Sequence, residues 1–129
     1  MRKHFAADQR LFKAFPGMHL VVAIVYDLDN RGARPTVSDF WRDAWEIAAS
    51  LGIEDARAHP HVDAWRRDFA ALGVSMKRFP TSIEALLRRA LKGGEPFSIN
   101  PLVDSYNALS LLHVCPAGFL RSRCTARAD

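Results

Sequence analysis

Residues 19–26 read HLVVAIVY, and this stretch decides the fold class that we expect. The run is continuously apolar and rich in β-branched residues, which is typical of a strand buried on both faces of a sheet. Pro16 and Gly17 precede it and favour an entry turn, whereas the polar residues 27–34 (DLDNRGAR) favour a loop after it. Such a strand needs partners on both sides, so the stretch predicts a sheet with a neighbouring strand on each side.

Downstream of this strand the sequence predicts a first amphipathic helix. Thr36 or Ser38 can cap its start, the helix continues through Ser50, and Gly52 lies just past its end. Apolar residues recur in it at a spacing of three to four, as one buried helix face requires. They are Phe40, Trp41, Ala44, Trp45, Ile47, Ala48 and Leu51.

Two further helices have clear boundaries. One opens at His59, with proline at its first helical position, and ends at Gly73. The other follows Thr81 and Glu84, whose spacing is that of a capping box, in which each side chain accepts the other residue's backbone N–H. Gly93 ends it, so these residues define two short helices in succession.

A fourth helix starts after Asn100, which can cap it, with Pro101 at its first position. Its apolar periodicity continues to about His113, and Pro116 and Gly118 stop it. The order of elements is therefore one strong strand followed by four helices.

This order indicates an α/β (α+β) fold with about one to three strands. Residues 113–119 (HVCPAGF) could supply a short second strand, but further partners are not visible, so the second half of the sheet is expected to be missing. Residues 119–129 show no periodicity and resemble disordered sequence. We therefore expect a partial domain over residues 1–118, followed by a tail over 119–129 with the character of a truncated end.

Composition indicates one globular domain in the cytoplasm. The chain has 129 residues, of which 49% are hydrophobic and 25% charged. Its longest apolar run is too short to cross a bilayer, and no apolar segment follows the basic N-terminus as a secretory signal would require. Cys115 and Cys124 lack a paired-cysteine spacing, which favours two reduced thiols. We expect no membrane partner and no cofactor.

Charge gives only weak support for a nucleic-acid partner. The formal net charge is +4, but the tail alone contributes +2 through three arginines and one aspartate. The rest of the chain carries nearly equal numbers of basic and acidic residues, which does not indicate a polyanionic partner. We do not expect DNA as a partner. The acidic loop around Asp29 and the HxH pair at His59 and His61 fall short of a metal-ligand set, so no metal is expected either.

Residues 98–118 (SINPLVDSYNALSLLHVCPAG), with the sequence that precedes them, resemble the B3/B4 domain. That domain occurs in the β subunit of bacterial phenylalanyl-tRNA synthetase and as free-standing proteins. This chain resembles the free-standing branch more than the synthetase. The similarity extends from about residue 22 to residue 118. The matching positions from residue 79 onward are Pro80, Ser82, Ile83, Leu86, Gly93, Ile99, Asn100, Pro101, Val103, Asp104, Asn107, Ser110 and Pro116.

The resemblance implies a mixed α/β fold and a site that, in the synthetase, hydrolyses tyrosine wrongly attached to phenylalanine tRNA. Asp104, Asn107 and Pro116 match the synthetase motif with the same spacing. Tyr106 stands where the synthetase has threonine, and Gly118 where it has a pocket histidine. With Asn100, these residues form the expected substrate-binding set. For Asp104 and Asn107 the alternative is a structural role in backbone hydrogen bonds.

After Gly118 the chain departs from the family, which continues with strands, a glycine-rich loop and a glutamate of the editing pocket. Three functions therefore stay open. The first is a non-catalytic module that binds tRNA, a synthetase or a small amino-acid-like ligand, with tRNA or aminoacyl-tRNA as the expected partner. The second is a trans-editing hydrolase of mischarged aminoacyl-tRNA, and the third is a truncated product without independent function.

Overall fold

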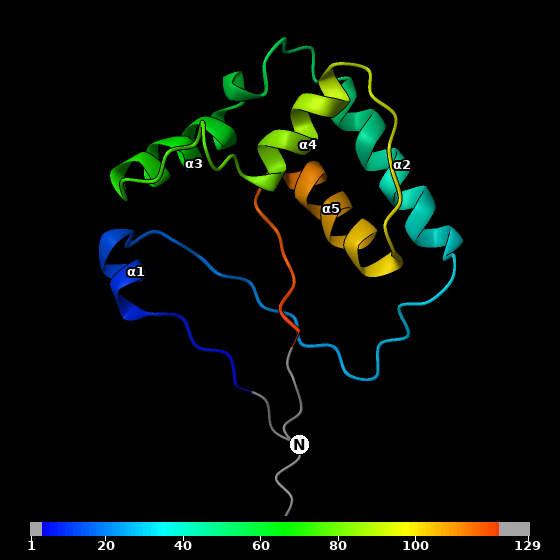
Figure 1. The fold of residues 1–129 in the computed structure, drawn as a ribbon, viewed down its shortest axis with the longest axis horizontal. Helices are drawn as coiled ribbons and strands as arrows, with labels where there is room; N and C mark the ends of the chain where they lie inside the picture. The colour runs from blue at the N-terminus through cyan, green and yellow to red at the C-terminus, as the bar shows by residue number, and fades with distance from the viewer. Residues whose placement is uncertain (1–3, 122–129) are drawn as a thin grey trace, which may run out of the picture.

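The computed structural model describes residues 4–121, and within this range every regular element is a helix (Figure 1). A bundle of three helices, α2, α4 and α5, forms the centre, and α3 lies beside α4. The N-terminal segment with α1 lies apart from the bundle, below it in the view. The elements are α1 (Gln9–Ala14), α2 (Pro35–Ala49), the 3-10 helix η1 (Ala56–Ala58), α3 (Pro60–Ala71), α4 (Ser82–Leu91) and α5 (Pro101–His113).

The expected α/β fold is wrong for the described part of the chain, which contains no strand and no sheet. The 19–26 segment crosses from α1 to α2 without regular structure, and its side chains are exposed, Val21 by 97%. Residues 113–119 form no second strand either, because His113 still belongs to α5 and Val114 adopts a left-handed conformation. A strand exists only through hydrogen bonds to a neighbouring strand, and residues 4–121 provide no neighbour.

All four predicted helices are confirmed, with one corrected start. α2 begins at Pro35, earlier than the predicted caps at Thr36 or Ser38, because proline at the first helical position is already arranged for a helix. Asn100 caps α5 as predicted: its side chain accepts a hydrogen bond from the Val103 N–H at 2.9 Å. The short α1, capped by Asp8, was not predicted and contributes no buried residue.

Two tryptophans of α2 organise the core. The Trp41 indole N–H donates to the Phe97 carbonyl at 2.9 Å, and the Trp45 indole N–H donates to the Gly94 carbonyl at 2.8 Å. The Phe97 ring meets both indoles edge to face, with centroids 6.2 Å from each. These contacts fix the α4–α5 linker against α2, which determines where α5 begins.

The capping box predicted at the start of α4 forms only in half. Thr81 accepts from the Glu84 backbone N–H at 3.4 Å, but the Glu84 carboxylate does not return to Thr81. It is buried instead, and Arg66 of α3 donates to both of its oxygens at 2.9 Å while Arg88 donates at 2.7 Å. This ion-pair cluster is the polar connection between α3 and α4.

The predicted apolar faces are buried unevenly. Trp41, Ala44, Trp45 and Ala48 of α2 are in the core, but Ile47 on the same helix is half exposed. On α3 only Val62 is fully buried. No helix within residues 4–121 has the length and apolarity needed to cross a bilayer. Of the predicted tail, residues 122–129 lie outside the described range.

Candidate functional site

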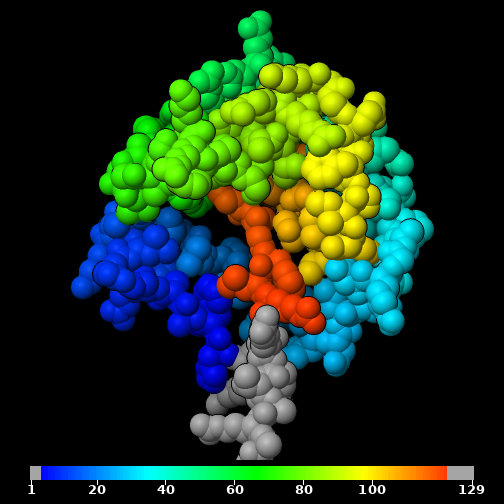
Figure 2. All heavy atoms as spheres, viewed as in Figure 1, coloured from blue at the N-terminus to red at the C-terminus, as the bar shows by residue number. Residues whose placement is uncertain are grey.

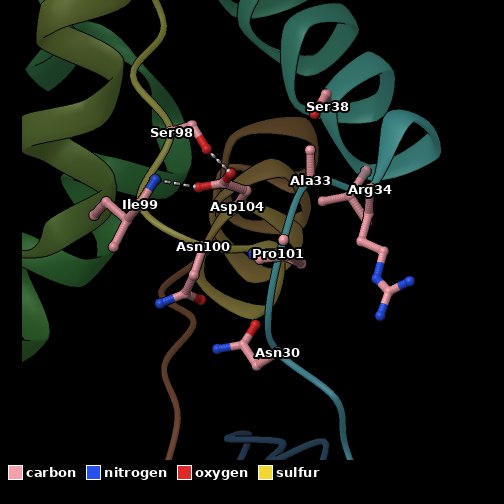
Figure 3. Close-up of a pocket in the computed structure, with 11 residues that line it drawn as sticks. Asn30, Ala33, Arg34, Ser38, Ser98, Ile99, Asn100, Pro101 and Asp104 are labelled. Carbon is pink, nitrogen blue, oxygen red and sulfur yellow. Dashed lines mark hydrogen bonds between the residues drawn. The ribbon is translucent and has the colours of Figure 1, made fainter.

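A polar pocket of about 400 Å³ lies where the starts of α2 and α5 converge (Figure 3). One wall is the α4–α5 linker with the first turn of α5, and the other is the loop before α2 with its first turn. The lining residues with polar side chains are Asn30, Arg34, Ser38, Ser98, Asn100 and Asp104. The pocket therefore joins the α4–α5 linker to a loop that is distant from it in sequence.

Asp104 anchors the linker wall of the pocket. Its carboxylate accepts a hydrogen bond from the Ser98 hydroxyl at 2.5 Å and from the Ile99 backbone N–H at 2.9 Å (Figure 3). The side chain is buried, so these bonds replace the water that an ionised carboxylate requires. A carboxylate can accept about four hydrogen bonds, so acceptor capacity remains on the side of the pocket.

The first turn of α5 has no free backbone donor for a ligand. Pro101 carries no N–H, the Leu102 N–H donates to the Asn30 side-chain oxygen at 2.8 Å, and Asn100 accepts from Val103. The Asp104 N–H donates to the Asn100 carbonyl in the ordinary helical pattern. Asn30 lies on the opposite wall and thus acts as a second cap of α5. Its hydrogen bond connects the two walls.

The backbone N–H groups in the first turn of α2 have fewer hydrogen-bond partners than those of α5. Its N-cap residue is Arg34, whose side chain forms no capping bond, and the Thr36 N–H has no hydrogen-bond partner among residues 4–121. The Arg34 guanidinium extends away from Asp104 and pairs with the Asp29 carboxylate at 3.2 Å (Figure 3). Hydrogen bonds from Arg31, and then the charge of Arg34, lower the pKa of Asp29. This wall is therefore polar, and its two arginines, Arg31 and Arg34, share Asp29 as their partner.

The structure brings together only two of the six predicted site residues. Asn100 and Asp104 line the pocket, but Tyr106 and Asn107 lie further along α5 and do not. Pro116 and Gly118 follow α5 at its other end, about 20 Å along the helix, and Gly118 is exposed. The six residues therefore do not form one site.

Asn107 is the one predicted residue whose state suggests something beyond helix structure. Its side chain is 8% exposed, and its carboxamide forms no hydrogen bond with any described residue. No buried side-chain nitrogen or oxygen of the described residues lacks a hydrogen-bond partner, so the polar atoms of the Asn107 amide still reach solvent. Asp104 and Asn100, by contrast, have the backbone hydrogen bonds that their structural interpretation requires.

The pocket lacks the groups of a conventional hydrolytic site. Ser98 donates to Asp104, but no histidine lines the pocket to act as a general base. In the part of the chain that the structure describes, no three histidine, cysteine or acidic side chains gather as metal ligands would.

The pocket residues of the α2 wall could not be found from sequence. Asn30 caps a helix that begins 71 positions later, and a contact at that separation leaves no local pattern. Ser38 was identified only as a helix cap. Comparison with protein-family models, curated proteins and solved structures finds no match. The pocket and the sequence resemblance to the B3/B4 domain are therefore the two grounds for a proposed function.

Asp104→Asn is expected to lower the free energy of unfolding by about 1–3 kcal/mol, because the neutral amide removes the charge that strengthens both hydrogen bonds and forces the Ser98 hydroxyl to turn from donor to acceptor. Urea unfolding would measure this change. Asp39→Asn is the matched control, since Asp39 is an exposed carboxylate on α2, paired with Arg42, and should change stability by less than about 1 kcal/mol. Equal stability of wild type and Asp104→Asn would contradict the anchoring role.

Proposed function

We propose that this chain is a non-catalytic binding module related to the B3/B4 domain, and that its pocket binds an amino acid or the aminoacyl end of tRNA. The observation that carries the proposal is the position of the pocket. One of its walls, from Ser98 to Asp104, is part of the segment in which the resemblance is most specific.

The polar groups of the pocket complement such a ligand. The remaining acceptor capacity of Asp104 favours an ammonium group, as the α-amino group of an amino acid provides. On the opposite wall, the Ser38 hydroxyl lines the pocket and can donate to a carboxylate or ester oxygen. A pocket with an acceptor on one side and a donor on the other selects a ligand that carries both.

The rim supplies a weak contact for a nucleic acid. Arg31 is almost fully exposed and Arg34 is half exposed, both next to the pocket in the loop before α2. Phosphate contacts by two arginines predict modest affinity that falls as salt rises, with a slope of roughly −1 to −2 in a plot of log K against log salt. Binding of tRNA without this dependence would exclude a phosphate contact at the rim.

The test is calorimetric titration with free tyrosine, phenylalanine and their amides. Ser38→Phe should weaken binding at least about tenfold, because a phenylalanine on the first turn of α2 occupies the pocket from an exposed position. Ser50→Phe, at the exposed far end of the same helix, is the matched control and should bind as wild type does. Identical affinity of wild type and Ser38→Phe would place the ligand elsewhere.

A second candidate is trans-editing of mischarged aminoacyl-tRNA, and the unpartnered carboxamide of Asn107 favours it. An amide whose hydrogen-bonding groups are not taken up by the protein could orient a water molecule or an ester. Deacylation of tyrosyl-tRNA would be assayed with wild type and Asn107→Ala. A rate above buffer that Asn107→Ala abolishes supports editing, whereas no rate above buffer, or equal rates, excludes it.

A further inference from the structure

The positive charge of the chain is concentrated in one part of the fold. Residues 55–92, which include η1, α3 and α4, carry eight lysines and arginines against four aspartates and glutamates, a net charge of +4. The other described residues, 4–54 and 93–121, carry six against nine, a net charge of −3. Figure 2 shows α3 and α4 in green to yellow-green, gathered over the upper part of the molecule. The nearly balanced total charge therefore hides a positively charged region.

Three arginines of this region lie around a buried carboxylate. The Glu84 side chain is 1% exposed and accepts hydrogen bonds from Arg66 of α3 and Arg88 of α4. Arg57 of η1, which packs against both helices, pairs with Asp55. The hydrogen-bonded Asp55 raises the pKa of Arg57, and the charge of Glu84 raises it further. The two ion pairs are therefore close enough to act on each other, and we call Arg57, Arg66 and Arg88 the arginine cluster.

The arginine cluster retains positive charge and free donors. Three guanidinium groups face two carboxylates, so one positive charge is not compensated within the cluster. Each guanidinium has five N–H donors, and Glu84 engages one nitrogen of Arg66 and one of Arg88. The side chains of Arg57, Arg66 and Arg88 are 59%, 30% and 44% exposed, so their remaining donors are accessible to a ligand.

The buried carboxylate prepares these arginines for an anion. Arg66 and Arg88 are held in place by Glu84 before any ligand arrives, so their ordering costs little on binding. Planar guanidinium groups match the oxygens of a phosphate, to which they donate paired hydrogen bonds.

We propose that the arginine cluster binds a phosphate group of a nucleic-acid backbone. The surrounding region favours a polyanion over a small phosphate, because its net charge of +4 attracts neighbouring phosphates as well. This site goes beyond the proposed function, since none of the three arginines lines the pocket.

The test is fluorescence anisotropy of a labelled RNA hairpin that carries no amino acid, titrated with the full chain at several salt concentrations. Arg57→Met should weaken binding about tenfold, because a charge-assisted hydrogen bond to phosphate is lost. It should also flatten the slope of log K against log salt by about 0.9, the effect of one phosphate contact. Arg42→Met is the matched control. It removes the same charge from an exposed arginine–aspartate pair on α2 and should bind within about twofold of wild type.

Arg66 and Arg88 also stabilise the fold, so a substitution there must keep the charge beside Glu84. Arg88→Lys retains the ion pair but replaces the planar donor group by a point charge, so it should weaken RNA binding while the circular dichroism spectrum stays that of wild type. Inorganic phosphate should displace the hairpin only at concentrations far above that of the RNA. Displacement at equal concentration would assign the cluster to a small phosphorylated ligand and overturn the proposal.

Other results would also overturn it. They are a wild type that does not bind the hairpin, an Arg57→Met or Arg88→Lys that binds as wild type does, and an Arg42→Met that weakens binding as much as Arg57→Met. Binding to phosphatidylserine vesicles without binding to RNA would assign the region to a membrane surface instead. Ser38→Phe obstructs the proposed pocket but should leave hairpin binding unchanged, so a failure of the pocket and a failure of the phosphate site are distinguished.

Discussion

Replacing Arg66 and Arg88 together by methionine is expected to lower the free energy of unfolding by about 3–5 kcal/mol. The Glu84 side chain is 1% exposed, and these two arginines are its hydrogen-bond partners among the described residues. The double variant leaves a carboxylate buried against apolar side chains, where its charge is not compensated. Urea unfolding followed by circular dichroism would measure the loss.

The same cluster offers a rescue and a control. Adding Glu84→Leu to the double variant removes the buried charge and should recover most of the lost stability, because a buried ion pair and an apolar replacement are often nearly equivalent. Arg67→Met removes an exposed partner of Asp63 on the same helix as Arg66 and should cost at most about 1 kcal/mol. If the triple variant is no more stable than the double, an unpaired charge is not the cause.

Trp45→Ala is expected to cost about 3–5 kcal/mol. The indole is almost fully buried, packs edge to face on Trp41 with centroids 5.2 Å apart, and donates to the Gly94 carbonyl. Its removal leaves a cavity and an unsatisfied carbonyl in the same place. Thermal and urea unfolding would show a lower midpoint for this variant.

Trp65→Ala is the matched control for this prediction. Trp65 of α3 is only partly buried and tilts on Phe69 with centroids 6.1 Å apart, so its removal opens less of a cavity. We expect a loss clearly smaller than that of Trp45→Ala. A loss as large for Trp65 would mean that α3 is part of the central core.

The helices could be predicted from sequence because their signals are local. The Asn100 side chain caps α5 by accepting a hydrogen bond from the Val103 N–H, only three residues later. Proline at the first helical position marks where α3 and α5 begin. The buried pattern of α2 was also correct at Trp41 and Trp45, because periodicity determines which face can be buried.

The predicted sheet was wrong, and most of the pocket could not be predicted, because both depend on partners distant in sequence. The 19–26 segment has the composition of a strand, but composition cannot supply the neighbour that a strand needs. The capping box at Glu84 failed for a related reason: two arginines, one of them on another helix, compete for the carboxylate more strongly than one backbone N–H. Asn30 was missed as a cap because its partner lies on another element.

The tryptophan contacts of α2 have an optical consequence. Two of the three indoles of this protein donate to carbonyls of the α4–α5 linker, and that linker continues directly into Ser98–Asn100 at the wall of the pocket. A displacement of this wall changes the surroundings of both chromophores at once. A ligand that moved this wall would therefore change the intrinsic emission of the protein, and no label would have to be attached.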